Sequence, residues 1–150
     1  MQRRGNQIGT IARILVRYTA LIGISVEAYN GGQRSVAEVL RCADRWGREI
    51  VLYEDTWYGK IVGDHADMVD RFDAVTAVLA DPERVHFDAA FPNGENFYGR
   101  DYPDHPFGVD YLKIVVRYDL VGAEEIGTIV SAYPAPHYRK HGERFKWQRR

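Results

Sequence analysis

Residues 113–134, KIVVRYDLVGAEEIGTIVSAYP, decide the fold class because their pattern is that of two strands joined by a turn. Apolar side chains alternate with others along residues 111–118 and again along residues 126–133, which is the period of a strand. Gly122 and the acidic pair that follows it suit the turn between them. The stretch therefore predicts a hairpin of two antiparallel strands.

Four polar residues of this hairpin are suited to holding a phosphate group: Lys113 and Arg117 on the first strand, Ser131 and Tyr133 on the second. The period of two places the members of each pair on one face of their strand. The sequence leaves the cross-strand register open. It also leaves open the alternative that these residues form the solvent face of a one-sided sheet.

The segment in front of the hairpin has helical patterns. Apolar side chains recur at helical spacing across residues 66–80, and Asp81 ends this pattern because a residue before proline disfavours the helical region. A second helix is expected to begin at Trp57, with Asp55 or Thr56 as its cap.

Short runs of strand-forming residues accompany these helices. Residues 49–53, 84–87 and 95–100 are each expected to form a strand. Ser35 and Glu38 fit a capping box, which indicates the start of a helix. Helices first and strands later predict an α+β fold, in which helices pack on one face of a roughly four-stranded antiparallel sheet.

Composition places the chain among ordinary globular proteins. Of 150 residues, 45% are hydrophobic and 27% are charged, and this length suits a single domain. We interpret residues 1–34 as an N-terminal extension, for which a helix is one possibility, and residues 35–150 as one domain. Arg13 and Arg17 interrupt the most apolar N-terminal stretch, so no membrane span and no membrane partner are expected.

The distribution of charge and the cysteine content bear on the class of binding partner and on the cellular location. Acidic side chains outnumber basic ones from Glu54 to Asp110, and the reverse holds from Tyr111 to Arg150. A basic C-terminal third can attract a polyanion although the net charge is −1, or it can be a solvated tail. The single cysteine, Cys42, cannot form an internal disulfide, which favours a cytoplasmic location.

Candidate chemistry concentrates on one histidine. The sequence has no phosphate-binding glycine loop, and its histidines show no familiar metal-ligand spacing, so neither a cofactor nor a metal is expected. His65 lies between the two predicted helices. It can serve as a helix-end hydrogen bonder, or as a general acid or base, since histidine titrates near neutral pH.

The order of several short motifs resembles that of a known nuclease group. GREIVLYEDTWYGKIVGDHADM is followed by LADPERV, ENFYGR, YLKIVVRY, GTIVSAYP and RKHGERFKW, over roughly residues 40–147. This order resembles the barnase/EndoU/colicin/RelE-like nucleases of bacteria and phages, called the BECR group. The resemblance implies a single nuclease domain, of a toxin- or phage-derived type, that cleaves RNA without a metal.

The resemblance also implies residue roles. It places the catalytic residues on His65, Arg100, Ser131 and Tyr133, and a late basic-glycine-acid element on Lys140, Gly142 and Glu143. In the 2′-hydroxyl mechanism that follows, we expect His65 to transfer a proton. The residues expected to hold phosphate or to stack on a base are Tyr98, Lys113, Arg117 and Lys140.

RNA is therefore the expected partner. An inhibitor protein of the antitoxin or immunity type, and a homodimer formed through the N-terminal segment, are further partners that the sequence leaves open. Two alternatives to an endoribonuclease also stay open. One is an RNA-binding module without activity, and the other is a protein-interaction domain.

Overall fold

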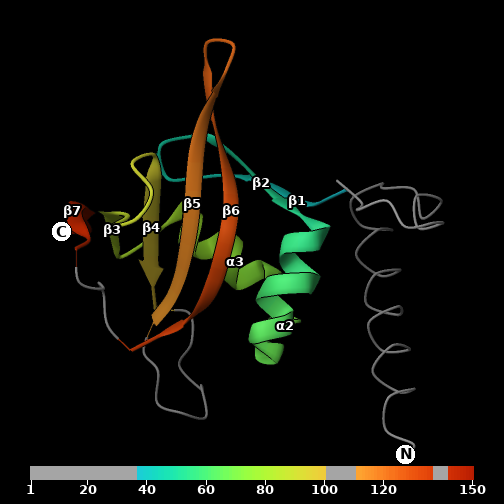
Figure 1. Cartoon of the computed structure of the whole chain (residues 1–150). Helices are drawn as coiled ribbons and strands as arrows, with labels where there is room; N and C mark the ends of the chain where they lie inside the picture. Colours follow the sequence, from blue (N-terminus) through green and yellow to red (C-terminus); the bar gives the residue numbers. More distant parts are fainter. Residues whose placement is uncertain (1–36, 101–110, 137–141) are drawn as a thin grey trace, which may run out of the picture.

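The computed structural model describes residues 37–100, 111–136 and 142–150. Within these residues seven strands form one mixed sheet in the order β1-β2-β6-β5-β4-β3-β7 (Figure 1). The strands are β1 (Glu38–Ala43), β2 (Glu49–Tyr53), β3 (Arg84–Phe87), β4 (Gly94–Gly99), β5 (Tyr111–Val121), β6 (Glu124–Ala135) and β7 (Arg144–Gln148). In the described ranges the helical elements lie between β2 and β3: the π-helix η2 (Asp55–Ile61), α2 (Val62–Asp64), the 3-10 turn η3 (Ala66–Met68) and α3 (Phe72–Ala80).

The expected fold class, helices packed on a roughly four-stranded antiparallel sheet, is wrong. The sheet has seven strands in the described residues, and β2 pairs with β6 in parallel. Its two edge strands were not expected. The capping box at Ser35 and Glu38 predicted a helix, but Glu38 begins strand β1 instead. Pairing with β2 and burial of Val39 outweigh this short local signal.

The helical segment also differs from its prediction in detail. The second helix begins at Asp55, two residues before Trp57, and no side chain caps its first turn. The pattern across residues 66–80 forms two pieces, η3 and α3, instead of one helix. The expected end is confirmed, since α3 stops at Ala80, directly before Asp81 and Pro82. None of the helices in the described ranges is long and apolar enough to cross a membrane.

The central hairpin is confirmed. Strands β5 and β6 pair antiparallel from Tyr111 opposite Ala135 to Val121 opposite Glu124, and they extend past the rest of the sheet (Figure 1). A bulge near Val115 makes Val130 an extra residue in β6. For this reason Ile129 points into the core, although strict alternation along β6 would place it on the same face as Ser131 and Tyr133.

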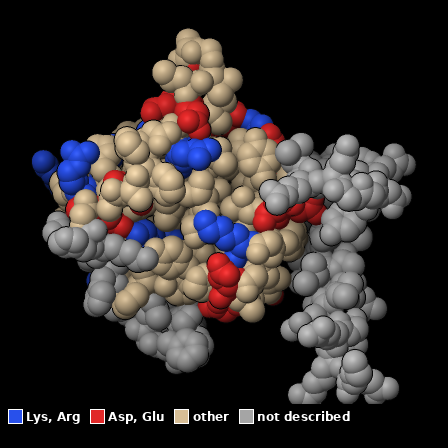
Figure 2. Space-filling view, in the orientation of Figure 1, with Lys and Arg blue, Asp and Glu red and all other residues tan. Residues whose placement is uncertain are grey.

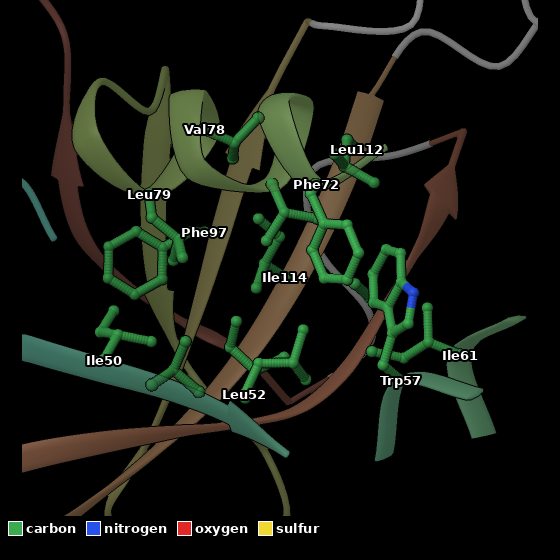
Figure 3. Packing of buried hydrophobic residues seen from close by; sticks show 14 of the residues in the cluster. Ile50, Leu52, Trp57, Ile61, Phe72, Val78, Leu79, Phe97, Leu112 and Ile114 are labelled. Carbon is green, nitrogen blue, oxygen red and sulfur yellow. The ribbon is translucent and has the colours of Figure 1, made fainter. Parts of the chain in front are cut away.

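The core lies between one face of the sheet and α3. Trp57 of η2 stacks on Phe72 of α3 with ring centroids 4.2 Å apart, and Leu112 and Ile114 of β5 belong to the same core cluster (Figure 3). These side chains are almost completely buried, and each contributes roughly 1.5–3 kcal/mol of hydrophobic free energy. The core fixes η2 beside β6, where the candidate site lies.

Gly99 at the end of β4 lets α3 approach the sheet closely. A Cβ atom at this position would lie 2.6 Å from Cγ2 of Val78, a buried side chain that is branched at Cβ. We expect Gly99→Ala to lower the free energy of unfolding by about 1–3 kcal/mol, from overpacking. Gly59 in η2 is the matched control, because its Cβ would enter open space and alanine favours helices. Urea denaturation should show Gly59→Ala at least as stable as the parent, and equal losses would contradict this packing.

Two further expectations fall on residues outside the described ranges. One is the N-terminal extension at residues 1–34 with its possible helix, and the other is the substrate-binding role of Lys140.

Candidate functional site

The candidate site forms along an edge of β6 that β2 does not cover. Strand β2 pairs with β6 only at residues 126–128, and the chain then turns into η2, which contacts β6, and on into α2 (Figure 1). His65 directly follows α2, and its backbone N–H donates to the carbonyl of Ile61 at 2.8 Å. The imidazole ring of His65 stacks on the ring of Tyr133, with centroids 5.6 Å apart and an interplanar angle of 19°.

A cation contacts the same strand three residues before Tyr133. Lys60 of η2 is exposed, and its Nζ donates to the backbone carbonyl of Val130 at 2.8 Å. Ser131 is the next residue of β6, and it lies two residues from Tyr133 on the same face. We call His65, Lys60, Ser131 and Tyr133 the β6-edge site. Sequence reasoning missed Lys60, since a lysine on a helix surface has no pattern that separates it from other surface lysines.

Beside this site, the face of the sheet opposite α3 contains a buried polar cluster. Tyr98, Lys113 and Tyr133 lie directly opposite one another on β4, β5 and β6. The Glu143 carboxylate accepts hydrogen bonds from the Tyr98 hydroxyl at 2.7 Å and from Nζ of Lys113 at 2.5 Å. Nδ1 of His86 donates to it at 3.3 Å. We call Glu143, His86, Tyr98 and Lys113 the Glu143 cluster.

The Glu143 cluster is shielded from water and internally balanced. Each of its four side chains belongs to a residue that is at most 4% exposed. Burial alone would raise the pKa of Glu143, but the hydrogen bonds from His86, Lys113 and Tyr98 lower it to about 2. Burial, and then the Glu143 carboxylate, raise the pKa of Tyr98. Glu143 is therefore ionised and a weak base at neutral pH, and it neutralises Lys113.

The structure brings together five of the sequence-predicted residues that it describes. His65, Ser131 and Tyr133 belong to the β6-edge site, and Tyr98 and Lys113 lie in the adjoining Glu143 cluster. Lys113 links the two groups, because its Nζ lies 5.7 Å from the centroid of the Tyr133 ring. Glu143 had a signal in the sequence, the late basic-glycine-acid element, whereas His86 had none.

Two predicted residues are not brought to this site. Arg100 follows β4 with its side chain 63% exposed, and its Nε lies 3.3 Å from Glu83. Arg117 shares a strand face with Lys113, as expected, but four residues of strand separate them by about 13 Å. Its Nε lies 3.4 Å from Asp119. Lys113 and Arg117 are therefore too far apart along β5 to contact the same phosphate group.

The distribution of surface charge bears on how a phosphate group could bind. Basic and acidic side chains are interspersed over the face drawn in Figure 2, instead of forming one broad basic surface. A phosphate group on this face would therefore depend on individual cations. Within the described residues, no group of three or more His, Cys, Asp or Glu side chains is arranged to hold a metal ion.

Fold and site together define a domain with a mixed seven-stranded sheet, a helical segment over one face and a buried carboxylate cluster on the other. Comparisons with models of protein families, with curated proteins and with solved structures found no match. The resemblance to the BECR group stays a prediction from the order of the sequence motifs.

Proposed function

We propose that this chain is a metal-independent endoribonuclease that cleaves RNA at the β6-edge site. The observation that carries the proposal is the stack of His65 on Tyr133. Along the same edge of β6 lie a hydroxyl, from Ser131, and an ammonium, from Lys60, which donates to the backbone carbonyl of Val130. These are the elements that phosphodiester cleavage by an internal nucleophile requires.

In the proposed reaction the ribose 2′-oxygen attacks phosphorus while the neutral imidazole of His65 accepts the 2′-hydroxyl proton. The resulting phosphorane collapses, the bond from phosphorus to the 5′-oxygen breaks, and the His65 imidazolium returns the proton to that oxygen. The products are a 2′,3′-cyclic phosphate and a 5′-hydroxyl. Lys60 and Ser131 contribute charge and a hydrogen bond at the phosphate, an effect that is often larger than proton transfer.

The Glu143 cluster has a positioning role in this proposal. Glu143 is excluded as the proton acceptor, because three hydrogen bonds lower its pKa to about 2. Lys113 has its charge neutralised by Glu143 and is 3% exposed, so it holds the Tyr133 ring from below the surface instead of binding phosphate. An ordered Tyr133 in turn orders the imidazole that stacks on it.

An RNA-binding module without activity is the second candidate. The pairing of Lys113 with Glu143 favours the absence of activity, because it removes one of the charges expected at the cleaved phosphate. A cytoplasmic location, a toxin- or phage-derived role and an inhibitor protein belong to the first proposal. The single cysteine supports the location, and the order of motifs supports the role.

The decisive experiment is incubation of the purified chain with a labelled RNA in the presence of EDTA. We expect cleavage to persist, and the products to have 2′,3′-cyclic phosphate and 5′-hydroxyl ends. An RNA with a single 2′-deoxy substitution at the cleaved position is the control, and it should resist. Products with 5′-phosphate ends, or activity that EDTA abolishes, would contradict the mechanism.

Two matched lysine and arginine variants refine the same assay. Lys60→Gln should slow cleavage, because it removes the ammonium beside Ser131. Arg117→Gln removes an exposed cation about 13 Å from Lys113 along β5, and it should change the rate less. The opposite order would place the phosphate near Arg117 and away from the β6-edge site.

A further inference from the structure

A second cluster of charged and aromatic side chains lies on the same side of the sheet as α3, away from the β6-edge site. Trp46, Arg48, Lys146 and Trp147 line an open depression of about 370 Å³, which we call the Trp46 pocket. Trp46 belongs to the turn between β1 and β2 and contacts Phe97 of the core edge-on, with ring centroids 6.2 Å apart. The volume of the Trp46 pocket lies in the usual range for small-ligand sites, about 300–1,000 Å³.

A local irregularity of β7 builds one wall of this pocket. Val85 of β3 lies opposite Trp147, but His86 lies opposite Phe145, so Lys146 is an extra residue in β7. Such a bulge can turn two neighbouring side chains toward the same side of a sheet. Lys146 and Trp147 both line the pocket, although strict alternation would separate them.

The two indole rings of the pocket stand nearly perpendicular. The centroids of Trp46 and Trp147 are 6.3 Å apart with an interplanar angle of 84°, and Trp46 is 41% exposed. Cations lie over both rings: the Arg45 guanidinium is 3.6 Å from the centroid of Trp147, and Nζ of Lys146 is 4.5 Å from that of Trp46. A large exposed indole ringed by cations is suited to a flat, anionic ligand.

The cations around the pocket differ in how they are neutralised. Arg48 forms ion pairs with Asp44 at 2.6 Å and with Glu95 at 2.7 Å, and Lys146 also pairs with Glu95. These pairs fix the pocket wall. Arg45 is exposed and forms no ion pair with the residues that the structure describes. Its charge is therefore available to an anion at the pocket rim.

We propose that the Trp46 pocket binds a nucleobase of single-stranded RNA, with the Arg45 guanidinium on an adjoining phosphate. The choice of RNA as the partner rests on the proposed function. A base stacks on the exposed indole of Trp46, and the phosphate meets the positive charge that no described carboxylate neutralises. Because Phe97 and Tyr98 point to opposite faces of β4, the pocket and the Glu143 cluster lie on opposite faces of the sheet. The pocket therefore holds a part of the strand remote from the cleaved bond.

The test is a titration of the full chain with a short 2′-O-methyl RNA, which cannot be cleaved through its 2′-oxygen. Tryptophan fluorescence reports on the pocket, while the fully buried Trp57 gives a constant background. Trp46→Ala should weaken binding by about tenfold or more, and Trp46→Phe should retain most of the affinity. Arg45→Gln should weaken binding and reduce its salt dependence by about one counterion. Arg41→Gln is the matched control, because Arg41 is exposed on the same hairpin but paired with Glu38 and Glu49.

The outcomes separate this proposal from the ribonuclease proposal. Weaker binding of the oligonucleotide by the Trp46 and Arg45 variants, with unchanged cleavage of a dinucleotide, supports the pocket. Unchanged affinity in folded Trp46→Ala, or in Arg45→Gln if the tryptophan variant does not fold, overturns it. Equal affinity for free uridine monophosphate and for the oligonucleotide overturns the assignment to an RNA strand. If the chain binds the oligonucleotide through Trp46 but cleaves no RNA, the pocket proposal stands and the ribonuclease proposal is wrong.

Discussion

Replacement of His65 by alanine is expected to lower the rate of RNA cleavage by about 10²–10⁴-fold, while RNA affinity stays within a few-fold. The separation arises because proton transfer stabilises only the transition state, so its loss leaves ground-state binding unchanged. Single-turnover kinetics with a labelled RNA measure the rate, and a 2′-O-methyl RNA measures the affinity.

Two controls distinguish proton transfer from a structural role of His65. Added imidazole should restore part of the activity of His65→Ala if the ring acts as a base, and it should do nothing if the ring only packs on Tyr133. Tyr133→Phe keeps the stacked ring and should lose less activity than His65→Ala. If His65→Ala melts like the parent and cleaves RNA equally fast, His65 is a helix-end residue and RNA binding without activity is the better proposal.

The elements that sequence predicts well in this chain are those whose periodicity is local. The hairpin of β5 and β6 alternates over many residues around a glycine with φ of +66°, and it forms as expected. The edge strands β1 and β7 were missed for a physical reason. Each is a short strand that exists because a neighbour, β2 or β3, supplies its hydrogen bonds, and no local pattern encodes that neighbour.

The candidate site could be predicted only in part for a similar reason. Lys113 and Tyr133 were selected as polar residues on a strand, and the register then placed them opposite each other. Their surroundings depend on contacts far apart in the chain. Glu143 reaches Lys113 across thirty positions and converts an expected phosphate ligand into a buried ion pair. Lys60 reaches β6 only because β2 ends early and leaves the Val130 carbonyl uncovered.

Lys113→Met is expected to have the largest effect on stability, with a loss of about 3–5 kcal/mol in the free energy of unfolding. The substitution leaves the Glu143 carboxylate, in a residue that is 4% exposed, without its ammonium partner. The double variant Lys113→Met with Glu143→Gln should be more stable than Lys113→Met alone, because the uncompensated charge is gone and a carbonyl remains for the Tyr98 hydroxyl. Urea denaturation of the single and double variants measures this coupling.

The exposed pair of Arg41 and Glu38 is the matched control for the buried pair. Its side chains are 49% and 36% exposed, so Arg41→Met should cost no more than about 1 kcal/mol, as surface ion pairs generally do. Equal losses for Lys113→Met and Arg41→Met would show that the Glu143 cluster is open to water in solution.

The same cluster predicts a pH dependence whose sign follows from the depressed pKa of Glu143. This pKa is about 2 in the folded chain and about 4.5 in the unfolded chain, so between these values only the unfolded chain binds the proton. Stability from Glu143 is therefore complete above about pH 4.5 and is lost as the pH falls toward 2, by an amount on the order of 3 kcal/mol.

Other carboxylates titrate in the same range, so the informative quantity is the difference in free energy of unfolding between the parent and Glu143→Gln. That difference should shrink steadily as the pH falls from 4.5 to 2, since protonation then removes from the parent the charge that the variant already lacks. A difference that stays constant over this range would mean that His86, Lys113 and Tyr98 do not stabilise an ionised Glu143.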